Sequence, residues 1–567
     1  MRPGGHMDPR EQDVEKPAQG WSRRTFVTAA GAGAGAAIAA AQSPTPAEDG
    51  RRARRAYRIR VDTARLQRDA FQPAHPDNRD ERLYGNRIGS YSKGLPHNDL
   101  GEVDPNAYDA LTQALLSGSQ DELERVPMGS PDPARREKFV NPCAGIGFDL
   151  QGADSHHKAI PPAPAFASAE QAGEMGELYW KALTRDVPFT AYDSDPLIQA
   201  AATDLSRFSD FRGPKSVGQV TPRTLFRGFT RGDIAGPYLS QFLLKPVPFG
   251  AQYVEQRMRT LLPGIDHMTQ YADWLAVQNG FPPSGAGMFD PTRRYIRNGR
   301  DLAQWVHVDV LYQAYFNAML IMLQPPDPTD DVTGGGMGVP LNRGNPYRKS
   351  ENQIGFGTFG APAIATAVAE IATRALKAVW YQKWYVHRKL RPEAFGGAVH
   401  NTITRSLTIY PIHMDLMRSA APERVRAKSG SYLLPMVFPE GSPLHPAYGA
   451  GHATVAGASV TILKALFDES FIVPNPVVAS ADGMSLVPYT GPDAANLSVG
   501  GELNKLAANV AIGRNFAGVH WRSDYTESVK LGEAIAISVL QDQRLTYGEE
   551  GFDGFSFTRF DGRPITV

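Results

Sequence analysis

The stretch from Ala361 to His387 is the feature that most limits how this chain can fold. Its sequence, APAIATAVAEIATRALKAVWYQKWYVH, is rich in apolar residues and has few charges before its end. Long helices that are buried among other helices have this composition. Ala453–Phe467 has the same character, and Glu502–Ile512 and Asp524–Leu540 also favour helices. We therefore predict a mainly α fold, built from helix bundles with long Gly/Pro-rich loops and minor β-structure.

Shorter helices and long connections make up the rest of the predicted fold. Ser168–Asp186 begins with a serine and acidic residues and has apolar residues at helical spacing. The other predicted helices are Tyr108–Ser117, Asp195–Phe208, Tyr253–Gln278 and Asp301–Leu323. Residues 325–360 contain too many Gly and Pro residues for a regular element, which indicates a lid or channel wall. Residues 551–567 alternate weakly and favour a short hairpin.

The N-terminus has the pattern of an export signal. The letters SRRTFV at residues 22–27 precede an apolar run, Val27–Ala41, that ends in small residues. This pattern is similar to a bacterial twin-arginine signal, and the run is shorter than the about 20 residues needed for a membrane anchor. We predict a signal at residues 1–41, a polar linker at 42–56, and two helical halves at 57–324 and 325–567. The mature protein is expected in the periplasm or outside the cell, without stable membrane insertion.

The overall composition restricts the possible partners. Lys plus Arg and Asp plus Glu both number 59, so the formal net charge is zero. This balance gives no global basic surface for nucleic acid, and any anion site must be local. The single cysteine, Cys143, excludes an intrachain disulfide framework and a zinc site made of thiolates.

Two cations stand at the end of the long apolar stretch. Lys383 lies near its C-terminal end, and Arg391 lies just beyond it, where Pro392 disfavours helical geometry. Both side chains could therefore turn toward one point beyond the helix. The alternative is that they cap helix carbonyls or lie on the surface, like the neighbouring Arg388 and Lys389.

A turn of small residues opens the next apolar helix. Gly449-Ala450-Gly451 directly precedes this helix, so free backbone amides point outward and the helix N-terminus favours negative charge. His452 lies in the first turn and could reach the same oxyanion as an acid or a base. An ordinary helix start after a glycine turn would have the same sequence.

The third polar stretch is GRNFAGVHWRSD at residues 513–524. We expect Arg514 and His520 to straddle a loop between two helices, with Asp524 at the start of the second helix. Asp524 could accept the ring N–H of His520 and fix its tautomer, although a simple N-cap would occupy the same position. The three stretches together supply three cations, backbone donors and two imidazoles. Such a set suits a tetrahedral or trigonal-bipyramidal oxyanion.

These motifs resemble the signature of vanadium-dependent haloperoxidases. The matching elements are Lys-x7-Arg-Pro, Gly-His at a helix start and Arg-x5-His-x3-Asp, and they run from Trp380 to Asp524. The family shares its site with type 2 phosphatidic acid phosphatases and bacterial acid phosphatases. The letters HPAYGAGHATVAGA and GVHWRSD are most similar to the bromoperoxidase branch.

The resemblance implies a vanadate cofactor, orthovanadate in its free form. His520 would be its one protein ligand, with Asp524 behind the imidazole. The equatorial oxygens would be held by Lys383, Arg391, Arg514 and the backbone amide of Gly451.

The resemblance also implies catalytic roles for four residues, His452, Lys383, His445 and Asp524. His452 would manage protons at the vanadate, and Lys383 would polarise bound peroxide. His445 stands where bromoperoxidases have an extra histidine, which favours bromide or iodide over chloride. Trp380 would line the same pocket.

One departure from the family pattern affects the site. The family usually has Pro-Ser-Gly-His where this chain has Gly449-Ala450-Gly451-His452. The serine hydroxyl that would bond an equatorial oxygen is therefore missing at Ala450. A hydrogen bond to a charged group contributes about 1.5–3 kcal/mol, so we expect weaker vanadate binding at an otherwise intact site.

The implied function is a vanadate-dependent haloperoxidase that oxidises bromide or iodide with hydrogen peroxide to hypohalous acid. The acid would halogenate a small organic acceptor, and the protein would be a homo-oligomer. Two alternatives stay open. A phosphomonoester phosphatase would use His520 as the nucleophile and His452 as the general acid. A protein that only binds an oxyanion would be consistent with Ala450.

Overall fold

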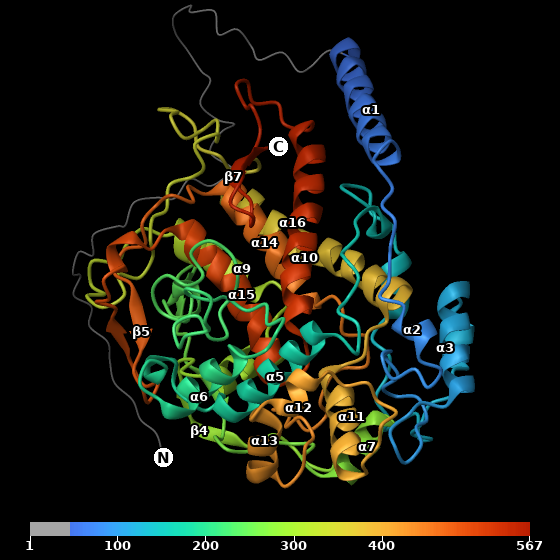
Figure 1. The fold of residues 1–567 in the computed structure, drawn as a ribbon. Coiled ribbons are helices and arrows are strands. Elements are labelled where there is room, and N and C mark those ends of the chain that lie inside the picture. Colours follow the sequence, from blue (N-terminus) through green and yellow to red (C-terminus); the bar gives the residue numbers. More distant parts are fainter. Residues whose placement is uncertain (1–45) are drawn as a thin grey trace, which may run out of the picture. The chain divides into compact units, whose positions relative to one another are not determined.

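The computed structural model describes residues 46–567 and is mainly helical, as predicted (Figure 1). Its α-helices are α1 (Pro46–Arg68), α2 (Asp80–Leu83), α3 (Pro105–Ser117), α4 (Gln120–Glu124), α5 (Ala169–Thr184), α6 (Pro196–Leu205), α7 (Tyr271–Gln278), α8 (Gly299–Val308), α9 (Gln313–Leu323), α10 (Ala361–Tyr381), α11 (Pro392–Thr404), α12 (Met414–Arg418), α13 (Ala421–Ser429), α14 (Gly451–Leu466), α15 (Val499–Ala517) and α16 (Arg522–Arg544).

The β-structure of this part of the chain consists of four separate antiparallel strand pairs. The strands are β1 (Val247–Phe249), β2 (Gln252–Val254), β3 (Met258–Leu261), β4 (Phe289–Arg294), β5 (Val477–Ala479), β6 (Leu486–Pro488), β7 (Ser556–Thr558) and β8 (Pro564–Thr566). Each odd-numbered strand pairs with the next strand along the chain. The β7–β8 pair confirms the predicted C-terminal hairpin.

Residues 59–567 form one compact unit, and the described residues 46–58 lie outside it. The predicted halves 57–324 and 325–567 share the larger unit, because α8 packs against α15 and α5 packs against α13. The predicted polar linker is helical from Pro46, where α1 begins, because its Arg, Ala and Glu residues are good helix formers. The predicted signal and residues 42–45 lie outside the described residues.

A buried bundle of α10, α14, α15 and α16 forms the centre of the larger unit (Figure 1). Every residue of α14 is buried except His452. The backbone N–H of Ala450 donates to Ser528 Oγ of α16 at 2.8 Å, and one turn further a Cβ on Gly532 would lie 2.0 Å from Thr454 O. These contacts advance together along both helices. The first turns of α14 and α16 are therefore brought to the same end of the bundle.

Two of the predicted helices are wrong in extent. Within Tyr253–Gln278 only α7 is helical, because β3 instead pairs with β4. Within Asp301–Leu323 the helix breaks after α8, since Asp309 has an extended backbone with φ −65° and ψ 146°. At this break the side chain of Asp309 points toward the candidate site, as described below.

The remaining predicted elements agree with the structure within a few residues. The helices α3, α5, α6, α10, α14, α15 and α16 all lie where the sequence placed helices. Residues 325–360 contain no helix or strand among the elements of the described chain. The mixed stretch after Pro392, for which no helix was predicted, forms α11, α12 and α13.

The helix α10 does not end in regular α geometry. Its last turn, Gln382–His387, is a π-helix (η5), and Arg388 then adopts a left-handed φ of 36°. Wider turns of this kind are often found at functional sites. Arg391 has an extended backbone before α11, as Pro392 predicts. The chain therefore turns sharply between Lys383 and Arg391.

In the described part of the chain, no single helix has the length and apolar content to cross a membrane. The helices α8 and α9 meet these criteria only when taken together, and they are bent by 99° at the break between them.

Candidate active site

The first and third polar stretches and the loop before the second meet at the side chain of Arg391. Its NH1 lies 3.1 Å from Nε2 of His520 and donates to the carbonyl of Val519 at 2.7 Å. Its Nε donates to the carbonyl of His445 at 2.8 Å, and its NH2 lies 2.9 Å from Nδ1 of the same residue. The guanidinium is 1% exposed. Arg391 therefore joins the end of α10, the loop before α14 and the loop before α16.

Lys383 is fully buried beside this junction. Its Nζ donates to the carbonyls of Pro446 and Ala447 at 2.7 and 3.1 Å. The same atom lies 5.6 Å from the centre of the Trp380 ring, and that ring lies 4.9 Å from the ring of His445. The predicted pocket residues Trp380 and His445 thus lie together beside Lys383.

The hydrogen bonds of His520 fix its tautomer. A guanidinium can only donate, so Arg391 requires a lone pair on Nε2 of His520. Burial, followed by the charge of Arg391, lowers the pKa of His520 well below its usual value and keeps the ring neutral. Its proton is therefore on Nδ1, which donates to Asp524 Oδ2 at 2.7 Å. The lone pair of Nε2 accepts from Arg391, and the charges of Lys383 and Arg514 also act on this ring.

Asp524 is not the N-cap that the sequence left open as an alternative, because Trp521 has that position and Asp524 lies three residues further, at N3 of α16. Its Oδ2 accepts from His520 and also from the backbone N–H of Trp521 at 3.0 Å, at the first turn of α16. The carboxylate therefore caps the helix and orients the imidazole. Burial raises the pKa of Asp524, and the charge of the nearby Lys389 opposes this shift.

Arg514 lies within α15, which extends beyond its predicted end at Ile512. Helix α15 continues to Ala517 and ends at Gly518, which has a left-handed φ of 89°. Arg514 NH1 donates to the carbonyl of Val306 at 2.9 Å, while its Nε is buried without a hydrogen-bond partner. Such an unpaired buried donor could bond an oxyanion.

His452 lies at the edge of the site, with 24% of its side-chain surface exposed. Its Nε2 lies 3.0 Å from Oδ1 of Asp309, the residue at which α8 ends. Asp309 also interacts electrostatically with Arg514. His452 has no hydrogen bond to His520. It is connected to the cation cluster through Asp309, which contacts His452 and interacts with Arg514.

The electrostatics of the cluster favour a bound anion. Burial is the largest cause of a lowered pKa at Lys383, Arg391 and Arg514, and for Arg391 the pKa falls to about 10. The neighbouring cations lower these pKa values further at Lys383 and Arg391. An oxyanion placed among the three side chains would relieve this repulsion. The residues present therefore fit vanadate or phosphate.

The turn before α14 is packed tightly around the predicted Gly451 position. A Cβ on Gly451 would lie 3.1 Å from Cζ3 of Trp380, so a larger residue would have to displace this ring. Ala450 is the N-cap residue of α14 and has no side-chain cap. Its backbone N–H donates to Ser528 of α16, so Ser528 fixes the backbone of this turn.

A second layer of buried charge lies behind Asp524. Lys389 Nζ is buried without a hydrogen bond, 3.8 Å from Oε2 of Glu174 and 5.2 Å from the ring of Trp521. Glu174 accepts from the backbone N–H of Ser523, at the start of α16. Burial raises the pKa of Glu174 to about 7, and Lys389 opposes this shift.

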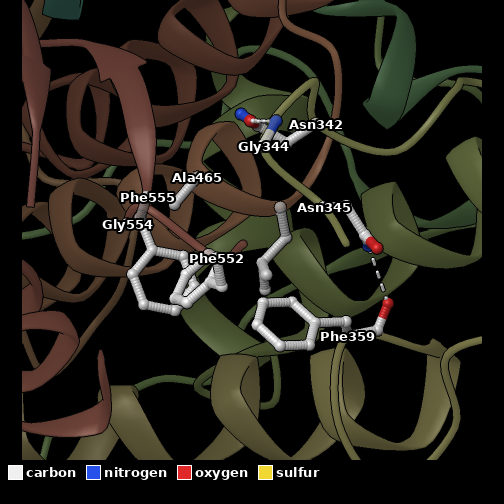
Figure 2. Close-up of a pocket in the computed structure, with 9 residues that line it drawn as sticks. Asn342, Gly344, Asn345, Phe359, Ala465, Phe552, Gly554 and Phe555 are labelled. Carbon is white, nitrogen blue, oxygen red and sulfur yellow. Dashed lines mark hydrogen bonds between the residues drawn. The ribbon is translucent and has the colours of Figure 1, made fainter. Parts of the chain in front are cut away.

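A different pocket lies away from these residues. Figure 2 shows it between Asn342, Asn345, Phe359 and Phe552, where Asn345 Nδ2 donates to Phe359 O at 3.0 Å. None of the residues that line it belongs to the cation cluster. Its walls are mainly apolar and it holds no titratable side chain, so it is not a candidate for the chemistry.

Comparison with known proteins agrees with the site. Residues 364–547 match a family model described as the VCPO second helical-bundle domain. The chain is 38% identical to the vanadium-dependent bromoperoxidase of Corallina pilulifera, over 88% of this chain and 93% of that protein. The chain belongs to the vanadium-dependent bromoperoxidase family.

Other members of the family support this assignment over the whole chain. The vanadium-dependent bromoperoxidase of Ascophyllum nodosum is 34% identical, over 88% of this chain and 94% of that protein. The homohexameric structure of the second vanadate-dependent bromoperoxidase from Ascophyllum nodosum superposes with a TM-score of 0.84 and 32% identity. That match covers 92% of this chain and 90% of the bromoperoxidase chain.

Three residues near the site were not predicted from the sequence. Asp309 is 143 residues from His452 along the chain, and no motif marks it. Glu174 looked like an ordinary acidic residue of a predicted helix. Lys389 was noted only as one of several cations after α10, and nothing in the surrounding sequence indicates that its side chain is buried.

The buried carboxyl of Glu174 gives a testable pH dependence of stability. Its pKa is about 7 in the folded protein against an ordinary value of 4.5, so the folded state binds an extra proton in that window. Its contribution to stability is full below about pH 4.5 and is lost as pH rises through about 7. Glu174→Gln removes this loss, which is worth about 3 kcal/mol as an order of magnitude.

Urea unfolding of the wild type and of Glu174→Gln across this pH range measures the effect. The stability of the variant relative to the wild type is expected to increase as pH rises from about 4.5 to about 7. A difference between the two proteins that stays constant with pH would contradict the raised pKa.

Proposed function

We propose that this protein is a vanadate-dependent haloperoxidase that uses hydrogen peroxide to oxidise bromide or iodide to hypohalous acid. The observation that carries the proposal is the lone pair of His520 Nε2, which faces three buried cations. An anionic metal oxide needs one such nitrogen ligand and several donors for its oxygens. The family to which the chain belongs consists of vanadium-dependent bromoperoxidases, which agrees with this proposal.

Each residue of the cluster has a defined part in holding vanadate. His520 Nε2 would be the protein ligand, and Asp524 keeps its ring in the required tautomer. Lys383, Arg391 and Arg514 would neutralise the oxygens, and the N–H of Gly451 would add a backbone donor at the helix start. Bound vanadate supplies Lewis-acid activation of peroxide without a change in its own oxidation state.

The proton needed for catalysis is assigned to His452. Its ring is partly exposed and is held by Asp309, so it can exchange a proton with solvent while keeping its orientation. Two N–H groups of Lys383 donate to carbonyls, which leaves one N–H that would polarise peroxide. Trp380 and His445 pack beside Lys383 and Arg391 and would form the wall along which halide approaches.

The phosphatase alternative uses the same pocket in a different way. His520 would attack a phosphate ester and His452 would protonate the leaving group. Vanadate would then inhibit, because it imitates the pentacoordinate phosphate. The curated relatives are bromoperoxidases, which favours halide oxidation over this alternative and over a protein that only binds an oxyanion.

Reconstitution with orthovanadate distinguishes the three possibilities. The vanadate-free protein is assayed for bromination of a phenol-type dye and for hydrolysis of an aryl phosphate, with and without vanadate. We expect bromination that requires vanadate and is lost in His520→Ala, because the only nitrogen ligand is removed. His413→Ala, which changes a partly exposed histidine at the start of α12, serves as the matched control and is expected to retain activity.

Two other outcomes would contradict the proposal. Hydrolysis of the phosphate ester that vanadate inhibits, without bromination, would establish a phosphatase. Tight binding of vanadate with neither activity would establish an oxyanion-binding protein.

The missing hydroxyl at position 450 gives a second prediction. Ala450→Ser is expected to tighten vanadate binding, because a hydrogen bond to a charged group is worth about 1.5–3 kcal/mol, or roughly 10- to 150-fold in affinity. Titration of the vanadate-free proteins measures the dissociation constants. The same serine could instead cap α14, which would raise the melting temperature and leave the dissociation constant unchanged. That result would show that position 450 does not contact the anion.

We also propose that the protein is exported through a twin-arginine pathway and assembles as a homo-oligomer. The export proposal rests on Arg23 and Arg24 before the apolar run. Replacing both by lysine is expected to keep the protein in the cytoplasm, and unchanged export in cell fractionation would contradict the proposal. The oligomer is supported by the homohexameric relative, and a monomer in analytical ultracentrifugation would contradict it. The organic acceptor is proposed only as a small molecule that reacts with hypohalous acid.

A further inference from the structure

A cluster of potential metal ligands lies outside the candidate active site. Asp154, His156 and His157 stand at the short helix η2 (Ser155–His157). Each offers one ligand atom, and these three atoms lie within 4.8 Å of one another. His157 is buried, and the other two side chains are partly exposed. None of the three belongs to the cluster around His520.

His157 provides the second observation that points to a ligand. Its side chain is only 8% exposed, and its Nδ1 is buried without a hydrogen-bond partner. Almost all buried polar atoms in folded proteins have a partner, so an unpaired ring nitrogen beside another imidazole and a carboxylate requires an explanation. A bound cation would provide one.

The surrounding hydrogen bonds hold the cluster in place. Asp154 Oδ1 accepts from the backbone N–H of Asp149 at 2.9 Å. The carbonyl of His156 lies 2.9 Å from Nε2 of His75, and Nδ1 of His75 lies 3.4 Å from the side-chain amide of Gln382. Both ring nitrogens of His75 therefore have partners, so His75 supports the cluster. The ligand atoms come from Asp154, His156 and His157.

We propose that Asp154, His156 and His157 bind a divalent transition-metal ion, with Zn²⁺ as the best match. Two imidazoles and one carboxylate are ligands that Zn²⁺ prefers, and water would complete a four-coordinate site. Ca²⁺ and Mg²⁺ prefer oxygen ligands, which the two histidines do not supply. Ligand atoms around a tetrahedral Zn²⁺ lie about 3.3 Å apart, so a pair at the 4.8 Å limit of this cluster would approach by about 1.5 Å on binding.

The site has a structural role at the end of α10. Gln382 is the first residue of the π-helical turn, and Lys383 follows it. The side chain of Gln382 also donates to the carbonyl of Lys158, so it connects this turn to the loop that carries the ligands directly at Lys158 and through His75 at His156. A metal ion would fix the conformation of that loop, which Gln382 joins to the turn that positions Lys383.

Titration of the whole protein tests the proposal. Tag-free protein is treated with a chelator, returned to metal-free buffer, loaded with vanadate and titrated with Zn²⁺ by calorimetry and with Co²⁺ by visible absorption. We expect one ion per chain, a tetrahedral Co²⁺ spectrum and a higher melting temperature with Zn²⁺. Vanadate loading keeps the histidines of the candidate active site occupied.

Two variants preserve the fold while removing ligands. Asp154→Asn keeps an oxygen for the Asp149 N–H, and His156→Gln keeps the backbone carbonyl that His75 contacts. Both are expected to weaken Zn²⁺ binding by at least roughly tenfold and to abolish the Zn²⁺-dependent rise in melting temperature. His413→Ala, which changes a histidine–carboxylate pair elsewhere, is expected to bind Zn²⁺ like the wild type.

The proposal is overturned if the wild type binds neither ion stoichiometrically. It is equally overturned if Asp154→Asn and His156→Gln retain the Zn²⁺ affinity of the wild type. Melting temperatures measured without metal show whether either variant is folded, so that lost binding is not confused with unfolding. Bromination activity is recorded separately, and its absence would bear on the proposed function and not on the metal site.

Discussion

Burial of three cations around a neutral imidazole is the constraint on which the site depends. Removing Lys383, Arg391 and Arg514 from water is unfavourable, and their mutual repulsion adds to the cost. Backbone carbonyls hold each of them in place, but a carbonyl carries no net charge to balance a cation. The lowered pKa values of the three groups express this imbalance. An anion that binds His520 would complete the arrangement.

Helix ends keep these charges in position. The π-helical turn after α10 ends at Arg388, so Lys383 and Arg391 face the same junction. The starts of α14 and α16 meet there because Ser528 holds the N–H of Ala450. The N-terminal ends of helices favour negative charge, and their contribution adds to that of the cations. The buried bundle thus creates a local anion site in a chain without net charge.

The sequence predicted the parts of the site that local spacing determines. His520 and Asp524 are four residues apart at a helix start, and this spacing alone places the carboxylate on the ring nitrogen. Arg514 was predicted as a site residue, but its helix is longer than expected because Gly518, not an earlier residue, ends it. Asp309 could not be found, because its contact with His452 depends on how α8 packs against α15. Likewise, the strand β3 was taken for helix because its pairing with β4 is a tertiary interaction.

A crystal structure of the vanadate-loaded protein, with an anomalous-difference map at the vanadium edge, tests the central claim most directly. The account predicts one vanadium peak per chain bonded to Nε2 of His520, with Arg391 NH1 moved from that nitrogen to a vanadate oxygen. A peak at another residue, for example at His452 and Asp309, would contradict the account. So would a fully loaded protein in which Arg391 still donates to His520.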